Sequence, residues 1–122
     1  MAKIVKLMNK YEVELNDNEN YIAGTSDLAS INFPNYLKDI GSIHAMITQK
    51  DGKCYIVPLN HNNLSFIKRG RLEAEIDAYK PFEIMDKDQI GFGQKEDEDE
   101  EGVFIKNKDP NKKINFYLQY FK

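Results

Sequence analysis

Few side chains in this sequence are of a type that could carry out chemistry. The 122 residues contain two histidines, His44 and His61, and one cysteine, Cys54. They supply too few ligands for a structural zinc site, and a lone cysteine cannot form a disulfide within the chain. The sequence suggests no serine or cysteine nucleophile with a histidine base and a carboxylate to orient it. It therefore indicates a protein that is not an enzyme and that needs neither a metal nor a cofactor.

The carboxylates offer no convincing acid and base pair. Asp86 and Asp88 are spaced for one, but nothing near them in sequence would raise a carboxyl pKa, so we expect turn residues before a strand. Six consecutive acids run from Glu96 to Glu101 without the interspersed turn residues of a calcium loop. The run is predicted to be a solvated loop; the alternative is an acidic segment that docks on a basic partner.

The overall charge argues against a dedicated nucleic-acid binder. Lys and Arg number 17 against 20 Asp and Glu, a net charge of −3 that becomes +3 (17 minus 14) outside the acidic run. Nucleic-acid binders usually carry a strong basic excess, although residues 103–122, with five lysines and one aspartate, could contact nucleic acid. No apolar stretch approaches the roughly 20 residues that span a bilayer, and no secretory signal opens the chain. We expect a cytoplasmic or nuclear setting and no membrane partner.

Alternation of apolar and polar residues is the dominant pattern. Residues 11–15 and 114–120 alternate as half-buried strands do. Further short strand-like runs are predicted at residues 4–7, 21–23, 45–48, 54–57, 65–67, 74–78, 89–92 and 103–106. Lys50-Asp51-Gly52-Lys53 between two such runs is a strong hairpin signal. Many short strands with no long amphipathic helix predict an all-β sandwich of two antiparallel sheets. We expect one domain over residues 1–122, with an acidic hairpin loop at 95–102 and at most a short helix at 35–40.

Four short motifs in a fixed order resemble those of forkhead-associated (FHA) domains. A Gly-Arg, a Ser-x-x-His, an asparagine turn and a Gly-Asp-x-Ile-x-Phe-Gly follow one another in that family. The corresponding segments here are Ile22-Ala23-Gly24-Thr25, Gly41-Ser42-Ile43-His44-Ala45-Met46-Ile47, Leu59-Asn60-His61-Asn62-Asn63-Leu64-Ser65-Phe66-Ile67 and Asp86-Lys87-Asp88-Gln89-Ile90-Gly91-Phe92-Gly93. The resemblance implies a β-sandwich that binds phosphothreonine peptides on loops at one end, with Gly24 and His44 as scaffold residues.

The chain departs from the family pattern where a phosphate would be held. The loop positions that the resemblance assigns to the ligand are Thr25, Ser26, Gly41, Ser42, Asn62 and Asn63. Thr25 stands in place of the arginine, Gly41 in place of the serine, and Ser42 in place of the basic residue after it. Two lost charge-assisted donors at roughly 1.5–3 kcal/mol each lower the affinity by about two to four orders of magnitude. Lys68, Arg69 and Arg71, which follow the Asn63 loop in sequence, would replace these donors if they swung toward the phosphate.

Two functions are therefore expected. The first is a protein-interaction module with weakened or lost phosphothreonine binding, acting through homodimerisation; Tyr117, Tyr120 and Phe121 are the candidate dimer surface, because strict alternation cannot bury all three. The second is phosphothreonine recognition through a rearranged pocket. More narrowly, the chain is similar to the N-terminal FHA domains of mediators of the DNA damage checkpoint, including the mutator 2 type, which implies a nuclear scaffold with a damage-response phosphoprotein as partner.

Overall fold

Eleven strands form the described part of the chain. The structure, a computed structural model, describes residues 2–94 and 114–122, so the acidic run and the expected strand at 103–106 lie outside the described residues. The strands are β1 (Lys3–Lys6), β2 (Tyr11–Glu14), β3 (Glu19–Gly24), β4 (Ile31–Asn32), β5 (Ala45–Lys50), β6 (Lys53–Pro58), β7 (Asn63–Arg69), β8 (Leu72–Ile76), β9 (Phe82–Ile84), β10 (Gln89–Gln94) and β11 (Asn115–Phe121).

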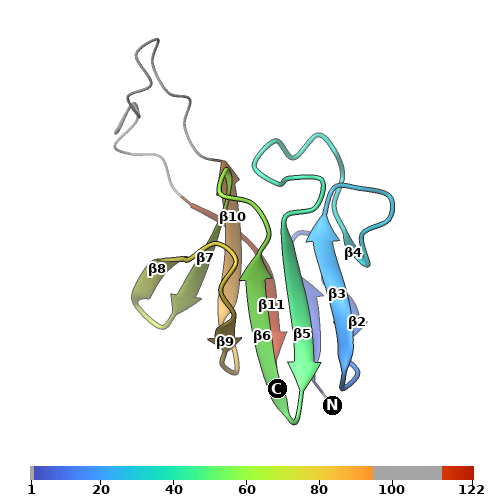
Figure 1. The fold of residues 1–122 in the computed structure, drawn as a ribbon, viewed down its shortest axis with the longest axis vertical. Helices are drawn as coiled ribbons and strands as arrows, with labels where there is room; N and C mark the ends of the chain where they lie inside the picture. Colours follow the sequence, from blue (N-terminus) through green and yellow to red (C-terminus); the bar gives the residue numbers. More distant parts are fainter. Residues whose placement is uncertain (1, 95–113) are drawn as a thin grey trace.

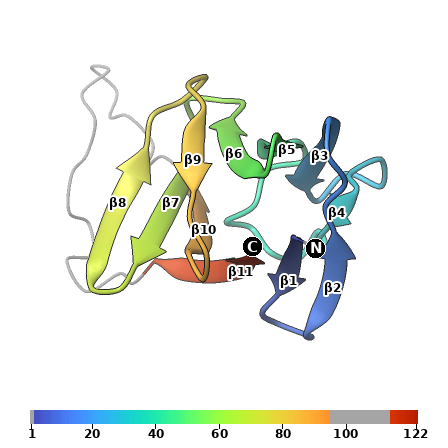
Figure 2. The same cartoon turned by 90° about the horizontal axis from the view of Figure 1, so that it is seen from below.

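These strands make two sheets that pack face to face as a sandwich, as the sequence predicted. One sheet has the order β2-β1-β11-β10-β7-β8 and the other β4-β3-β5-β6-β9. Figures 1 and 2 show the layers from two sides, with β10 and β11 lying across from β5 and β6. All strand pairs are antiparallel except β3 and β4, which are parallel, so the sheets are mostly rather than wholly antiparallel.

Alternation places the apolar side chains between the sheets. Ile47 and Ile56 from one sheet and Ile90 and Leu118 from the other have no exposed surface, and Phe33 closes the core beside β4. Burying side chains of this size stabilises the fold by about 1.5–3 kcal/mol each. The described residues contain no helix long and apolar enough to cross a membrane.

The β5–β6 hairpin forms where the sequence predicted it. Lys50 pairs with Lys53, and Asp51 and Gly52 have φ values of 52° and 77°, the positive φ pair that a two-residue type I′ turn requires. The short helix allowed for at 35–40 does not form. The segment instead makes two single turns, closed by Leu37 N–H to Pro34 O and by Ile40 N–H to Leu37 O.

The sandwich has two different ends. We call the end that carries the β3–β4, β4–β5 and β6–β7 connections (residues 25–30, 33–44 and 59–62) the loop end, at the top of Figure 1. The opposite end, the turn end, carries the tight β5–β6 and β7–β8 turns and both chain termini. A strand of six residues is about 20 Å long, so the two ends are separate surfaces.

Candidate functional site

Backbone hydrogen bonds join the first two connections of the loop end. The Thr25 N–H donates to Gly41 O at 3.0 Å, and the Ser26 N–H donates to Ser42 O at 3.0 Å. Gly24 precedes this pair, and a Cβ at its position would overlap the Ser42 carbonyl. A backbone carbonyl cannot move aside as the tip of a side chain can, so only glycine fits where these two connections meet.

The third connection joins at Asn63, the first residue of β7. The Asn63 side chain lies so close to Gly41 that a Cβ there would overlap its amide. Asn62 is exposed one residue earlier, where its N–H donates to Asn60 Oδ1 at 2.7 Å. The structure thus brings together all six loop positions predicted from the sequence, namely Thr25, Ser26, Gly41, Ser42, Asn62 and Asn63.

His44 ties the β4–β5 connection to the start of β7. The Gly41 N–H donates to Nδ1 at 2.8 Å, and Nε2 is 2.7 Å from Leu64 O, an arrangement that requires the neutral ring with its proton on Nε2. The ring is fully buried and lies 4.4 Å from the Phe92 ring centroid. Burial lowers the pKa of His44 to about 4, against the opposing effect of the Leu64 carbonyl. These contacts are those of a structural brace, the role expected from the resemblance.

Asp39 fixes the β4–β5 connection to the other sheet. Its Oδ2 accepts hydrogen bonds from Asn115 Nδ2 at 3.0 Å and from the Tyr117 hydroxyl at 3.2 Å, and its backbone oxygen accepts one from Gln94 Nε2 at 3.0 Å. Burial, followed by the Asp39 carboxylate, raises the pKa of Tyr117. The longest connection of the loop end is therefore held against β10 and β11 by side chains more than 50 residues away.

The three connections carry almost no positive charge. Lys38 is their one lysine or arginine, and Asp27 and Asp39 are their acids, so the formal sum is one minus two, or −1. The whole sequence contains only two arginines, Arg69 and Arg71, and both lie at the turn end. These three connections therefore present mainly hydroxyl and amide groups, with one lysine and no arginine to pair with a phosphate. Lys80, on the β8–β9 connection, lines a groove with Asn60 and Asn63.

The structure corrects the expectation that Arg69 could reach the loops. Arg69 is the last residue of β7 and Asn63 the first, which separates them by about 20 Å. Arg69 Nε and Nη2 lie 3.0 Å and 2.7 Å from the two carboxylate oxygens of Asp88, which is 1% exposed and also accepts the Met85 N–H at 2.7 Å. Asp88 is thus a buried ion-pair partner rather than a simple turn residue.

Lys68 and Arg71 are equally remote from the loops. Lys68 Nζ lies 3.9 Å from Glu73 and 5.7 Å from the centroid of the Phe116 ring. Arg71 follows Gly70 in the exposed β7–β8 turn. None of the three basic residues considered from the sequence is positioned to hold a phosphate at the loop end.

The C-terminal strand is not an exposed dimer surface. β11 lies between β1 and β10 in the centre of its sheet. Tyr120 is 1% exposed, with its hydroxyl 3.3 Å from Gln49 Oε1, and Tyr117 is half-buried and stacked on Phe92 with ring centroids 6.1 Å apart. Phe121 is also partly covered, with Lys3 over its ring. The three rings do not all face one core, as alternation predicted, but none is exposed: Tyr120 is buried between the sheets, and Tyr117 and Phe121 are partly covered by Phe92 and Lys3.

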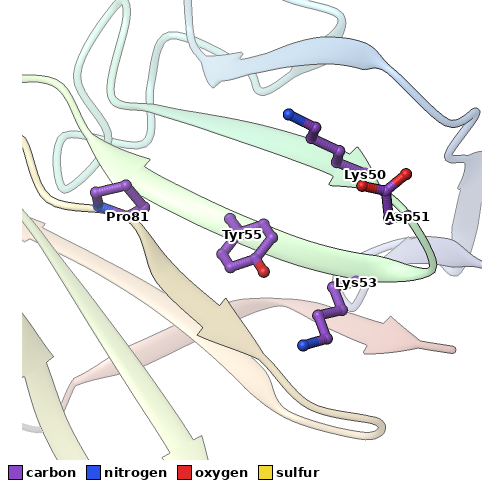
Figure 3. A pocket seen from close by; sticks show the side chains of 5 residues that line it. All are labelled: Lys50, Asp51, Lys53, Tyr55 and Pro81. Carbon is purple, nitrogen blue, oxygen red and sulfur yellow. The ribbon is translucent and has the colours of Figure 1, made fainter.

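A hollow at the turn end lacks the geometry of an anion-binding site. It has a volume of about 530 Å³ and is lined by Lys50, Asp51, Lys53, Tyr55 and Pro81. Figure 3 shows the two lysine side chains pointing away from each other on either side of Tyr55. Because the ammonium groups diverge and face solvent, they do not converge on one anion.

The sole cysteine is inert. Cys54 is fully buried, and burial raises the pKa of its thiol to about 12, so almost none is present as the reactive thiolate at neutral pH. Within residues 2–94 and 114–122, no three histidine, cysteine or acidic side chains cluster as metal ligands do.

Comparison with known proteins identifies the family. Residues 21–93 match the FHA domain family, which is more than half of the 122 residues, and the chain belongs to that family. FHA domains are non-catalytic protein-interaction modules that bind phosphopeptides. No curated protein sequence matches the chain.

Solved FHA structures share the fold. An engineered FHA domain with a Myc-pTBD peptide has a TM-score of 0.67 at 11% identity over 98% of this chain and 89% of its own. The N-terminal FHA domain of S. cerevisiae Rad53p, in complex with a phosphothreonine peptide, has a TM-score of 0.65 at 11% identity over 98% and 91%. The FHA domain of human APLF, in complex with an XRCC1 bisphospho peptide, has a TM-score of 0.63 at 13% identity over 99% and 97%. At these identities the likeness shows the fold alone.

Two features of the structure were not predicted from the sequence, one at the loop end and one at the turn end. Leu28, Tyr36 and Ile43 lie on the connections and are 92%, 65% and 51% exposed, and nothing in a single sequence marks an apolar loop residue as exposed. The burial of Asp88 did leave a signal, because Asp88 continues the alternation of Ile90 and Phe92 on the core face of β10.

Proposed function

We propose that this FHA domain is a protein-interaction module with weakened or lost affinity for phosphothreonine. The charge of the loop end is the observation that carries the proposal. A phosphothreonine brings nearly two negative charges and needs charge-assisted donors, whereas the three connections here carry one lysine, Lys38, and two aspartates. Two missing charged donors lower the affinity by about 3–6 kcal/mol, or two to four orders of magnitude.

The backbone of the loop end supports the same conclusion. The N–H groups of Thr25 and Ser26 already donate to Gly41 and Ser42, so they are not free for phosphate oxygens. The Asn63 side chain occupies the space that a side chain at Gly41 would need. The alternative, phosphothreonine recognition through a rearranged pocket, would have to rely on neutral hydroxyls such as that of the exposed Ser42.

The apolar side chains of the loop end support association with another protein surface. Leu28, Tyr36 and Ile43 are more than half exposed on adjoining connections, and exposed aromatic and aliphatic side chains of this kind are enriched in interfaces. We include homodimerisation in the proposal and assign it to this surface, since β11 is central and covered.

The cellular setting rests on resemblance. The similarity to N-terminal FHA domains of DNA damage checkpoint mediators supports a nuclear scaffold in the DNA damage response. The phosphopeptide complexes of the Rad53p and APLF domains suggest a phosphoprotein as the partner class, bound here through contacts other than a strong phosphate site.

Two measurements test the proposal. Fluorescence anisotropy should give nearly equal, weak binding of a degenerate phosphothreonine peptide library and its unphosphorylated counterpart; micromolar binding that depends on the phosphate would contradict it. Sedimentation equilibrium should show a dimer that Leu28→Asp/Ile43→Asp dissociates and that Leu72→Asp, an exposed change at the turn end, does not. A wild-type protein that stays monomeric at every concentration would remove homodimerisation.

A further inference from the structure

The open edge of the six-stranded sheet is a surface that the loop-end proposal does not use. β8 is the last strand of that sheet and pairs only with β7 among the described strands. Its first four residues, Leu72 to Glu75, are exposed on both faces of the strand, and Leu72 is 60% exposed. An edge strand of this kind offers unpaired backbone N–H and C=O groups to an added strand.

The side chains of β8 define which strand could be added. Glu73 and Glu75 point to one face, and the exposed Asp77 continues their spacing of two residues, so carboxylates recur about every 7 Å. Within the sheet, Glu73 is opposite Lys68, and the long distance of 3.9 Å between Lys68 Nζ and Glu73 Oε1 indicates a weak ion pair. Glu75 is opposite Phe66, which has no charge to neutralise it.

A second copy of this chain does not match the edge. A two-fold axis normal to the sheet would join two β8 strands antiparallel and keep odd-numbered residues opposite odd-numbered ones. When β8 overlaps its copy along its whole length, Glu73 faces Glu75 of the copy and Glu75 faces Glu73, and like charges directly opposite each other destabilise a strand pair. Registers shifted so that Arg71 faces Glu73 or Glu75 pair fewer residues of β8. The edge therefore disfavours full pairing with its own copy and favours a strand with basic residues at alternate positions.

A groove beside the same edge offers room for one of those basic side chains. Glu75, Asp77 and Lys80 line it together with Asn60 and Asn63 at the end of the β6–β7 connection, and its volume is about 580 Å³. A long lysine or arginine side chain could lie along the groove with its charge near Glu75 and Asp77. Two carboxylates and one ammonium group line the groove, so it has an acidic excess of one charge.

We propose that β8 binds an extended segment of a partner protein in which lysine or arginine alternates with apolar residues, and that this segment adds a strand to the six-stranded sheet. The other end of the sheet is a poorer match. On β2, Glu12 already pairs with Lys3 at 2.9 Å, and a third carboxylate at the same spacing is lacking, since Asn16 follows Glu14.

The test uses a synthetic peptide in which lysine and valine alternate, with a scrambled peptide that groups the lysines as its control. Glu73→Lys/Glu75→Lys should weaken binding of the alternating peptide by about tenfold or more, since it replaces attraction with repulsion at two cross-strand positions. Glu12→Lys/Glu14→Lys makes the same charge change on β2 and should weaken it much less. In two-dimensional NMR spectra of the wild-type protein, the peptide should shift and protect backbone amides of β8.

Three results would overturn the proposal. They are no binding of the alternating peptide, equally strong binding of the scrambled peptide, and a loss of affinity in Glu12→Lys/Glu14→Lys as large as that in Glu73→Lys/Glu75→Lys. Amide shifts confined to the loop end would overturn it too, and would place the peptide on the surface of the proposed function. If the charge-reversed protein does not fold, as judged by circular dichroism, Glu73→Gln/Glu75→Gln and Glu12→Gln/Glu14→Gln provide the same comparison.

Discussion

Protonation of His44 should destabilise the folded protein in mild acid. The neutral ring accepts the Gly41 N–H at Nδ1, and a doubly protonated ring could not. The pKa is about 4 in the folded protein and 6.5 when the ring is in water. Between these values the unfolded chain binds more protons than the folded protein, so this group favours folding fully above pH 6.5 and progressively less as the pH falls toward 4.

The size of the effect follows from the two pKa values. Each unit of difference corresponds to about 1.4 kcal/mol, so at pH 4 the free energy of unfolding should be lower by about 3 kcal/mol through this group alone. A glutamine at position 44 could still accept from Gly41 and donate to Leu64 but does not titrate. Urea unfolding of wild type and His44→Gln should therefore diverge by about that amount between about pH 7 and pH 4.

Taking the difference between the two proteins removes the contribution of carboxyl groups that both share. His61→Gln, a change at the exposed histidine, is the matched control and should keep the wild-type profile. Parallel pH profiles for wild type and His44→Gln would refute the reasoning, because the buried ring would then bind a proton as readily as an exposed one.

Two further predictions concern stability. Gly24→Ala should lower the free energy of unfolding by about 1–3 kcal/mol, since its Cβ meets the Ser42 backbone, and by more than Gly41→Ala, whose Cβ meets only the movable Asn63 side chain; equal melting temperatures in thermal denaturation would contradict this. Asp88→Ala should cost about 2–4 kcal/mol in urea unfolding, because the Arg69 guanidinium and the Met85 N–H lose their buried acceptor, and a loss below about 1 kcal/mol would show that the pair contributes little.

Much of the fold could be predicted from local pattern. Alternation located most strands, and Lys50-Asp51-Gly52-Lys53 located the hairpin, since both signals act between near neighbours. β9 was missed because Phe82–Ile84 is too short to show a period. The position of β11 between β1 and β10 could not be read either, because strand order is set by packing across the whole chain; that is why Tyr120 was expected at the surface and is buried.

The candidate site, too, could be predicted from the sequence only in part. The six loop positions came from motif order and lie together in the structure. Arg69 is remote from these positions because β7 runs from the loop end to the turn end, and a short motif does not show in which direction a strand runs. The ion pair between Arg69 and Asp88 joins residues that are 19 apart in sequence. The hydrogen bond from the Tyr117 hydroxyl to Asp39 joins residues that are 78 apart, so no short segment of the sequence could predict it.

The most direct test of the account is to add the missing charge to an otherwise intact loop end. Thr25→Arg/Ser42→Arg restores two cations and leaves Gly41 unchanged, since a side chain there would overlap Asn63. Leu72→Arg/Met85→Arg adds the same charge at exposed positions of the turn end. In titrations with the phosphothreonine library, the loop variant should bind about two orders of magnitude or more tighter than wild type, with the gain lost on dephosphorylation, and the turn-end variant should match wild type. Wild-type binding already in the micromolar range, or no gain over the turn-end variant, would contradict the claim that missing charge is what separates this domain from a phosphothreonine reader.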